Sequence, residues 1–84
     1  MPNRNKQEEE ILKAIGKNIR NIRQINKFTQ EEFAYITGFS RSYYTEIETG
    51  KRNISILNFL KILKALNTEP NSVLLPLLND IKEN

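Results

Sequence analysis

The chain has 84 residues, a length that fits one domain with a thin hydrophobic core. It contains no cysteine and no histidine, which excludes disulfide bonds, thiolate and imidazole catalysis, and the usual zinc ligands. The formal net charge is +3, and residues 11–55 carry eight Lys or Arg against four Glu, so the basic surplus is local and suggests a polyanionic partner.

The sequence also bears on location. No apolar run reaches the about 18 residues that a membrane span needs, and the first seven residues lack the apolar stretch of a signal peptide. We therefore expect a cytoplasmic protein of one domain over residues 1–84, with residues 1–7 as a polar, frayed tail. Its acidic residues are scattered, so we expect neither a metal site nor a cofactor.

The first predicted helix starts at about Glu8 and ends near Asn26 and Lys27. Acidic residues in its first turn, Glu8 to Glu10, suit the positive end of the helix dipole. Its apolar residues fall on one helical face: Ile11, Ile15, Ile19 and Ile22.

A capping box begins the second predicted helix. Thr29 precedes Glu32 by three residues, so each side chain can bond to the backbone of the other. The helix is expected to run through Thr37 and to end at Gly38, a residue able to adopt the left-handed conformation.

Two serines precede the next two predicted helices. Ser40 caps a helix that runs to about Thr49 and ends at Gly50, and Ser55 caps another that runs through Leu66. This later helix is apolar around much of its circumference, with Ile56, Leu57, Phe59, Leu60, Ile62 and Leu63 before its final leucine.

The last segment, residues 69–82, is predicted to start after a cap at Thr68 and to be kinked or split at Pro76. It is more apolar than a fifth helix over a thin core requires. We expect it to form a dimer interface through Val73, Leu74, Leu75, Leu77, Leu78 and Ile81, although packing of all six within one chain remains an alternative.

The stretch from Gln30 to Glu48 has the organisation of a DNA-reading helix-turn-helix: a short helix, a glycine-containing turn and a second helix. Ala34 is small where the two helices must cross. Four residues are expected to point inward, namely Phe33, Phe39, Tyr44 and Ile47. That leaves a polar outer face on the second helix, formed by Arg41, Ser42, Thr45 and Glu46.

The runs Thr29–Ala34 and Ile47–Arg52, with Gly38 between them, resemble the Cro/repressor-type (XRE) helix-turn-helix family over roughly residues 11–68. This resemblance implies an all-α, five-helix, lambda-repressor-like DNA-binding domain. The segments Arg41–Tyr43 and Gly50–Ser55 are most similar to the controller proteins of restriction–modification systems. Such proteins are homodimers that regulate their own gene and that of the endonuclease.

The resemblance also implies residue roles. Arg41 and Ser42 match base-reading positions, and Thr45 and Glu46 match secondary ones one turn later. An arginine in such a place suits the O6 and N7 atoms of guanine. The positions that match phosphate contacts are Gln30, Tyr43, Lys51, Arg52 and Asn53.

In the same family an arginine seven residues before the motif's glutamine pairs with a glutamate near the end of the recognition helix. Arg23 and Glu48 have that spacing, which implies a structural ion pair. The chain departs from the family at two positions. Lys27 replaces a glycine and must lie near the left-handed region, and Tyr44 replaces a β-branched aliphatic residue.

The sequence thus predicts a homodimeric transcriptional regulator of double-stranded DNA, not an enzyme, with no small-molecule substrate. A restriction–modification controller is the first hypothesis. The alternatives are a phage-type repressor or antitoxin with the same fold, and a protein-interaction module that has lost DNA binding.

Overall fold

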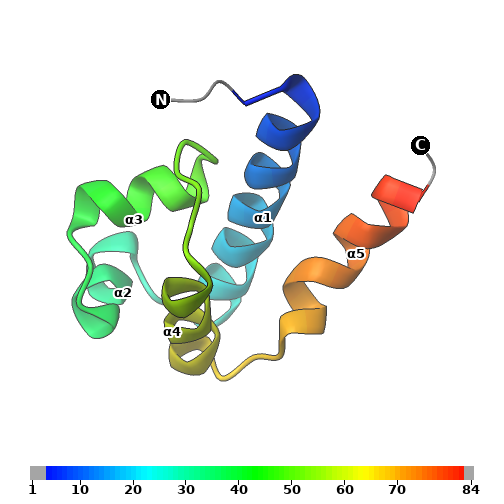
Figure 1. The fold of residues 1–84 in the computed structure, drawn as a ribbon. Helices are drawn as coiled ribbons and strands as arrows, with labels where there is room; N and C mark the ends of the chain where they lie inside the picture. Colours follow the sequence, from blue (N-terminus) through cyan, green and yellow to red (C-terminus); the bar gives the residue numbers. More distant parts are fainter. Residues whose placement is uncertain (1–3, 83–84) are drawn as a thin grey trace.

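The computed structural model describes the backbone of residues 4–82 and the side chains of residues 4–78. These residues form five helices and no strand (Figure 1), which confirms the predicted all-α fold. The helices are α1 (Lys6–Ile25), α2 (Gln30–Thr37), α3 (Arg41–Glu48), α4 (Ile56–Leu66) and α5 (Pro70–Lys82).

The start of α1 differs from the sequence prediction. The helix begins at Lys6 because Asn5 caps it, so residues 6 and 7, expected in a frayed tail, are helical. The Asn5 side chain accepts a hydrogen bond from the Glu8 amide at 2.8 Å, and the Glu8 carboxylate accepts one from the Asn5 amide at 3.1 Å. This reciprocal pair is a capping box, which satisfies donors that a helix start otherwise leaves free.

The predicted start and end of α2 are confirmed. Thr29 Oγ1 accepts from the Glu32 amide at 3.0 Å, and the Glu32 carboxylate accepts from the Thr29 amide at 2.8 Å. Gly38 ends the helix with a φ of 82°. In the preceding turn Lys27 has a φ of 65°, so it adopts the left-handed conformation that the sequence required of it.

The start of α5 corrects the sequence prediction. The Thr68 amide donates to the Leu63 carbonyl at 3.0 Å, so Thr68 belongs to the end of α4 and α5 begins two residues later. The helix also continues through Pro76, which does not split it. Proline removes one backbone donor, and α5 tolerates that loss without ending.

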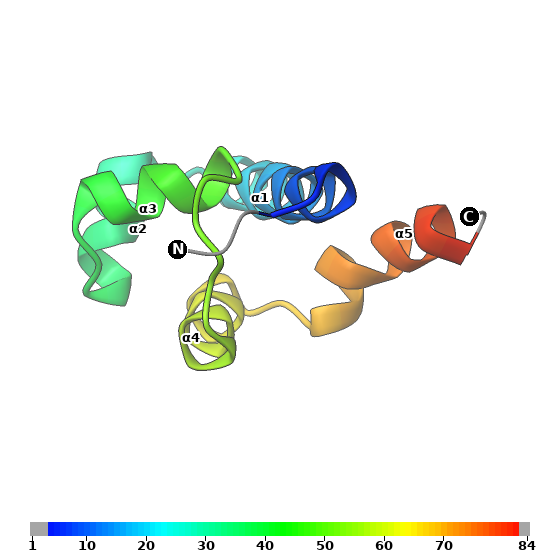
Figure 2. The same ribbon diagram turned by 45° about the horizontal axis from the view of Figure 1, so that its top comes forward.

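Five side chains below 2% exposure come one from each helix, and they define the centre of the core: Ile19, Phe33, Tyr44, Ile62 and Val73. In Figures 1 and 2, α2 and α3 lie at one side of α1 and α5 lies at the other. Accordingly, α1 contacts both α3 and α5, while α2 contacts α3 and α4. The core therefore fixes α3 on a central helix and leaves its outer side uncovered.

Candidate nucleic-acid interface

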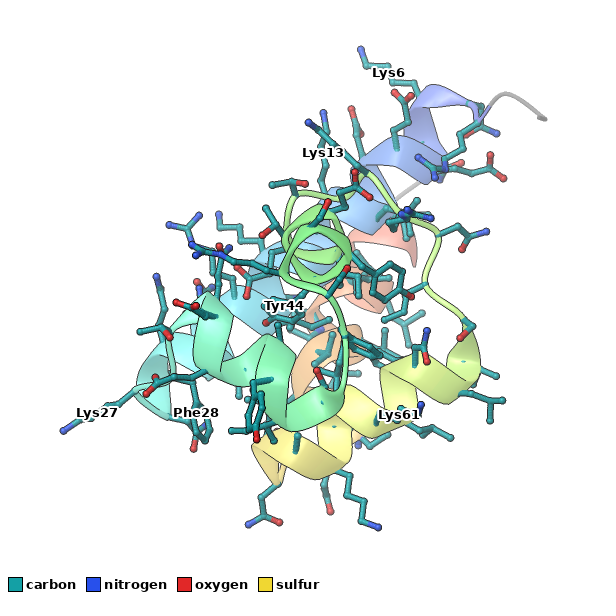
Figure 3. All side chains as sticks on the ribbon, turned by 90° about the vertical axis from the view of Figure 1, so that its left-hand side faces the viewer. Lys6, Lys13, Lys27, Phe28, Tyr44 and Lys61 are labelled. Atoms are coloured by element: carbon teal, nitrogen blue, oxygen red, sulfur yellow. The ribbon has the colours of Figure 1, made fainter. Side chains whose placement is uncertain are left out.

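The turn between α2 and α3 holds the two helices at a fixed angle. The Phe39 amide donates to the Ala34 carbonyl at 3.0 Å, and the Ser40 hydroxyl accepts from the Tyr43 amide at 3.1 Å. Tyr44, at the position where the family has an aliphatic residue, is fully buried and its ring centre lies 5.2 Å from that of Phe33. Figure 3 shows Tyr44 directed into the molecule beneath α3, whereas Lys27 points away from it.

The four predicted base-reading residues all lie on the uncovered side of α3. Arg41 and Ser42 are exposed, and Thr45 and Glu46 are half-buried. The Arg41 guanidinium lies 3.9 Å from the Glu31 carboxylate, at the outer limit of an ion pair. A contact this long between two exposed groups is weak, so the Arg41 side chain is available to a partner.

Arg23 and Glu48 form a buried ion pair. Arg23 Nε donates to Glu48 Oε2 at 2.6 Å and Nη2 donates to Oε1 at 3.2 Å, with the two side chains 7% and 1% exposed. Arg23 also donates to the Phe28 carbonyl at 2.6 Å. The pair thus connects α1, the loop before α2, and the end of α3.

The environment of Glu48 favours its charged form. Burial alone would raise the pKa of this carboxyl, but the hydrogen bonds to its oxygens, from Arg23 above all, outweigh burial and lower the pKa below its usual value. Burial also raises the pKa of the Tyr44 hydroxyl, and there it is not outweighed, so the hydroxyl remains neutral. The Glu48 carboxylate is therefore charged at neutral pH, and the Arg23 guanidinium balances that charge.

Gln30 connects this pair to the recognition helix. Its Nε2 donates to Glu48 Oε1 at 2.9 Å, and its Oε1 accepts from the Thr45 hydroxyl at 3.4 Å. The sequence predicted a phosphate contact for Gln30 and gave no sign of this bridge. Gln30 is half-buried, so the bridge also sets the direction in which its amide faces the surface.

Two of the predicted DNA-contacting residues bind each other. Arg52 Nε donates to Glu46 Oε1 at 2.7 Å, and the Arg52 guanidinium lies 5.3 Å from the centre of the Tyr43 ring. The remaining predicted phosphate contacts, Lys51 and Asn53, are exposed beside them in the loop after α3. The carbonyl of Lys51 accepts from Arg4 at 3.2 Å, which joins this loop to the start of the chain.

The predicted dimer segment needs correction. Val73 is fully buried within the chain and Leu77 is 8% exposed, so both pack on the protein's own core and are not free for a partner. Leu74 is half-buried, and only Leu75 and Leu78 are exposed. The Ile81 side chain lies outside the described residues.

Sequence reasoning missed a larger apolar surface on α4, where Ile56, Leu57 and Leu60 are between 48% and 69% exposed. Beside it lies an apolar groove lined by residues of α1, α4, α5 and the loop before α4: Ile15, Ile54, Ile56, Phe59 and Leu74. The signal was present in the sequence, because α4 is apolar on more sides than one core can cover. We call the exposed residues Ile56, Leu57 and Leu60 of α4, together with Leu75 and Leu78 of α5, the apolar face of the chain.

Within the described residues no helix combines the length and apolar character of a membrane span. The same residues contain no group of three or more acidic side chains placed to hold a metal ion.

The profile of the helix-turn-helix domain family matches residues 16–76. The chain is 36% identical over 59 residues to the control protein C.SmaI of Serratia marcescens, which covers 70% of each chain. The solved structure of the restriction–modification controller protein C.AhdI of Aeromonas hydrophila superposes with a TM-score of 0.70 at 37% identity, covering 74% of this chain and 94% of that one.

A further solved structure contains the controller protein C.Esp1396I as a tetramer in complex with its natural 35 base-pair operator. It matches with a TM-score of 0.71 at 30% identity and covers 84% of this chain and 93% of that one. The matched region includes all of α2, α3 and α4 and parts of α1 and α5. The chain therefore belongs to the helix-turn-helix domain family.

Proposed function

We propose that this chain is a sequence-specific DNA-binding transcriptional regulator of the restriction–modification controller type, which binds palindromic operator DNA as a homodimer. The observation that carries the proposal is the uncovered side of α3, where exposed Arg41 and Ser42 stand on a helix fixed by a buried ion pair. The relatives support it, since C.SmaI and C.AhdI are named as controllers and C.Esp1396I is seen with operator DNA. Such a protein works in the cytoplasm, needs no cofactor and catalyses no reaction.

Specificity for a DNA sequence comes from α3, which enters the major groove. Arg41 and Ser42, at its start, reach the base edges, and Thr45 is placed one turn further along the same side. A long arginine with two parallel donors recognises guanine through O6 and N7. Arg41 is therefore the principal base-reading residue.

Affinity and register come from phosphate contacts on either side of α3. Gln30 is the first residue of α2, and the positive end of a helix dipole favours a phosphate group. On the other side stand the loop residues Lys51, Arg52 and Asn53, with Tyr43 next to them. A two-fold dimer would set its recognition helices about 34 Å apart, one turn of the duplex.

The proposal is tested by selecting bound duplexes from a random pool with the purified protein. The selected duplex and a random one are then compared by fluorescence anisotropy. Arg41→Ala should lower the preference for the selected duplex by about 1–3 kcal/mol, whereas Lys51→Ala should weaken both duplexes alike.

Binding should also fall steeply with salt, with a log–log slope of about −0.9 for each neutralised phosphate. A protein that selects no common sequence would contradict the proposal and favour a protein-interaction module. If Arg41→Ala leaves the preference unchanged, the base-reading assignment is wrong even though the protein binds DNA.

The genes that neighbour the gene of this protein separate the three kinds of regulator. A neighbouring endonuclease gene indicates a controller, a toxin gene indicates an antitoxin, and phage genes indicate a phage-type repressor.

A further inference from the structure

The Glu46 side chain forms an ion pair with Arg52 on the surface of the protein. Its carboxylate accepts from Arg52 at 2.7 Å, with the Arg52 side chain 54% and the Glu46 side chain 37% exposed. The guanidinium also lies over the ring of Tyr43. The positive charge of Arg52 is thus held between a carboxylate and an aromatic face.

The aromatic face is itself fixed to the rest of the domain. The Tyr43 hydroxyl accepts from Asn58 Nδ2 of α4 at 2.8 Å. Its ring packs edge-on against Phe39, with ring centres 5.1 Å apart. Arg52 belongs to the loop after α3, yet groups anchored on α3 and α4 determine where it rests.

This arrangement bears directly on DNA binding, because Arg52 lies where a phosphate contact is expected. A guanidinium with a carboxylate at 2.7 Å presents almost no net charge to a phosphate. The Glu46 carboxylate therefore competes with a phosphate for the Arg52 guanidinium. Exposed ion pairs are weak enough for such an exchange, and its cost is the same for every duplex because every duplex carries phosphates.

We propose that Glu46 is a positioning residue that restrains Arg52 and lowers the affinity of the protein for all DNA, and that it does not read a base. The inference rests on the proposed DNA-binding function. It assigns the loop after α3 a role in setting how tightly the protein binds any duplex.

The experiment uses Glu46→Gln, which keeps the shape of the side chain and removes its charge. Affinities for the selected duplex and for a random duplex of equal length are measured by anisotropy. We expect both affinities to rise by about 3–10-fold, their ratio to stay constant, and the log–log salt slope to steepen by about one phosphate. A base-reading Glu46 gives another result: the selected duplex binds more weakly and the ratio falls.

A double-mutant cycle separates restraint of Arg52 from plain repulsion between Glu46 and phosphates. With restraint, Glu46→Gln raises affinity more in the wild-type background than in the Arg52→Ala background, since only the wild type has a pair to open. Equal gains in the two backgrounds overturn the proposal.

Glu69→Gln, in the connection between α4 and α5, is the control for net charge, and it should change either affinity by less than Glu46→Gln does. Melting curves of both variants verify that they are folded. If the wild type selects a duplex and Glu46→Gln binds both duplexes as the wild type does, this inference alone fails. If the wild type binds neither duplex, the proposed function fails with it.

Discussion

Gly16 of α1 lies directly against the carbonyl oxygen of Ile47 at the end of α3, with no room for a side chain between them. A Cβ at position 16 would also stand 2.5 Å from the carbonyl oxygen of Glu48. Backbone atoms of a packed helix cannot move aside as a flexible side chain can. This close approach sets the distance between α1 and α3, and with it the position of the outer side of α3.

Gly16→Ala should therefore destabilise the protein. In a helix interior alanine normally stabilises by about 0.5–1 kcal/mol relative to glycine, so a loss can come only from the clash. We expect a net loss of about 1–3 kcal/mol, which lowers the melting temperature by at least about 4 °C in a domain of this size. Circular dichroism melting measures it, with Lys17→Ala on the exposed side of α1 as the control. A variant that melts at or above the wild-type temperature would show that the two helices can separate at little cost.

Removing one partner of the buried ion pair between Arg23 and Glu48 should lower the free energy of unfolding more than Gly16→Ala does. Glu48→Ala leaves the Arg23 guanidinium buried without its carboxylate, a change that costs about 3–5 kcal/mol. Urea unfolding gives the free energy directly. Glu31→Gln is the matched control, since Glu31 is 80% exposed and lies 3.9 Å from its arginine, and it should cost less than about 1 kcal/mol. Equal losses for the two variants would mean that the buried pair adds nothing beyond a surface contact.

The same pair should make stability depend on pH. The pKa of Glu48 is lowered in the folded protein, so the unfolded chain takes up a proton at higher pH than the folded chain does. The stability from this group is therefore complete above the unfolded pKa of about 4.3 and is lost as the pH falls through the folded value. Unfolding free energies of the wild type and of Glu48→Gln, measured between neutral and acidic pH, should differ most at neutral pH and converge in acid. A constant difference across this range would contradict the assignment.

Local signals predicted most of the fold. The capping residues Thr29, Ser40 and Ser55 each accept from the backbone amide three residues later, so three helices begin where the sequence placed them. The same pattern starts α1 at Asn5 and Glu8, a capping box that the sequence analysis overlooked. In α5 the four-residue spacing of Val73 and Leu77 places both on the core side, so helical periodicity could have separated them from Leu75 and Leu78.

The features that the sequence did not predict are contacts between residues far apart in the chain, which no local pattern encodes. Gly16 approaches the end of α3 across about thirty positions of sequence, and nothing beside it in the chain marks the contact. The bridge from Gln30 to Glu48 and Thr45 joins two helices through one side-chain amide, whose direction depends on the angle of packing. Likewise Arg52 meets Glu46 only because the loop after α3 folds back on that helix. The resemblance supplied residue types for the interface, and only the folded structure shows which of them contact one another.

The apolar face on α4 and α5 gives a direct test of the homodimer. Leu57 is 69% exposed in one chain, so Leu57→Glu should leave the fold of that chain intact while placing a charge in the interface. Ile25→Glu is the control, because Ile25 is 76% exposed at the end of α1 and does not belong to α4 or α5.

In sedimentation at micromolar concentration we expect the wild type and Ile25→Glu to be dimers and Leu57→Glu to be a monomer. The melting temperature of the wild type should rise with protein concentration, since association stabilises the folded chain by mass action, and that of Leu57→Glu should not. A Leu57→Glu protein that still sediments as a dimer would place the interface elsewhere. A wild type that is monomeric throughout would instead leave α3 to bind a single half-site, without the two-fold spacing that a palindromic operator requires.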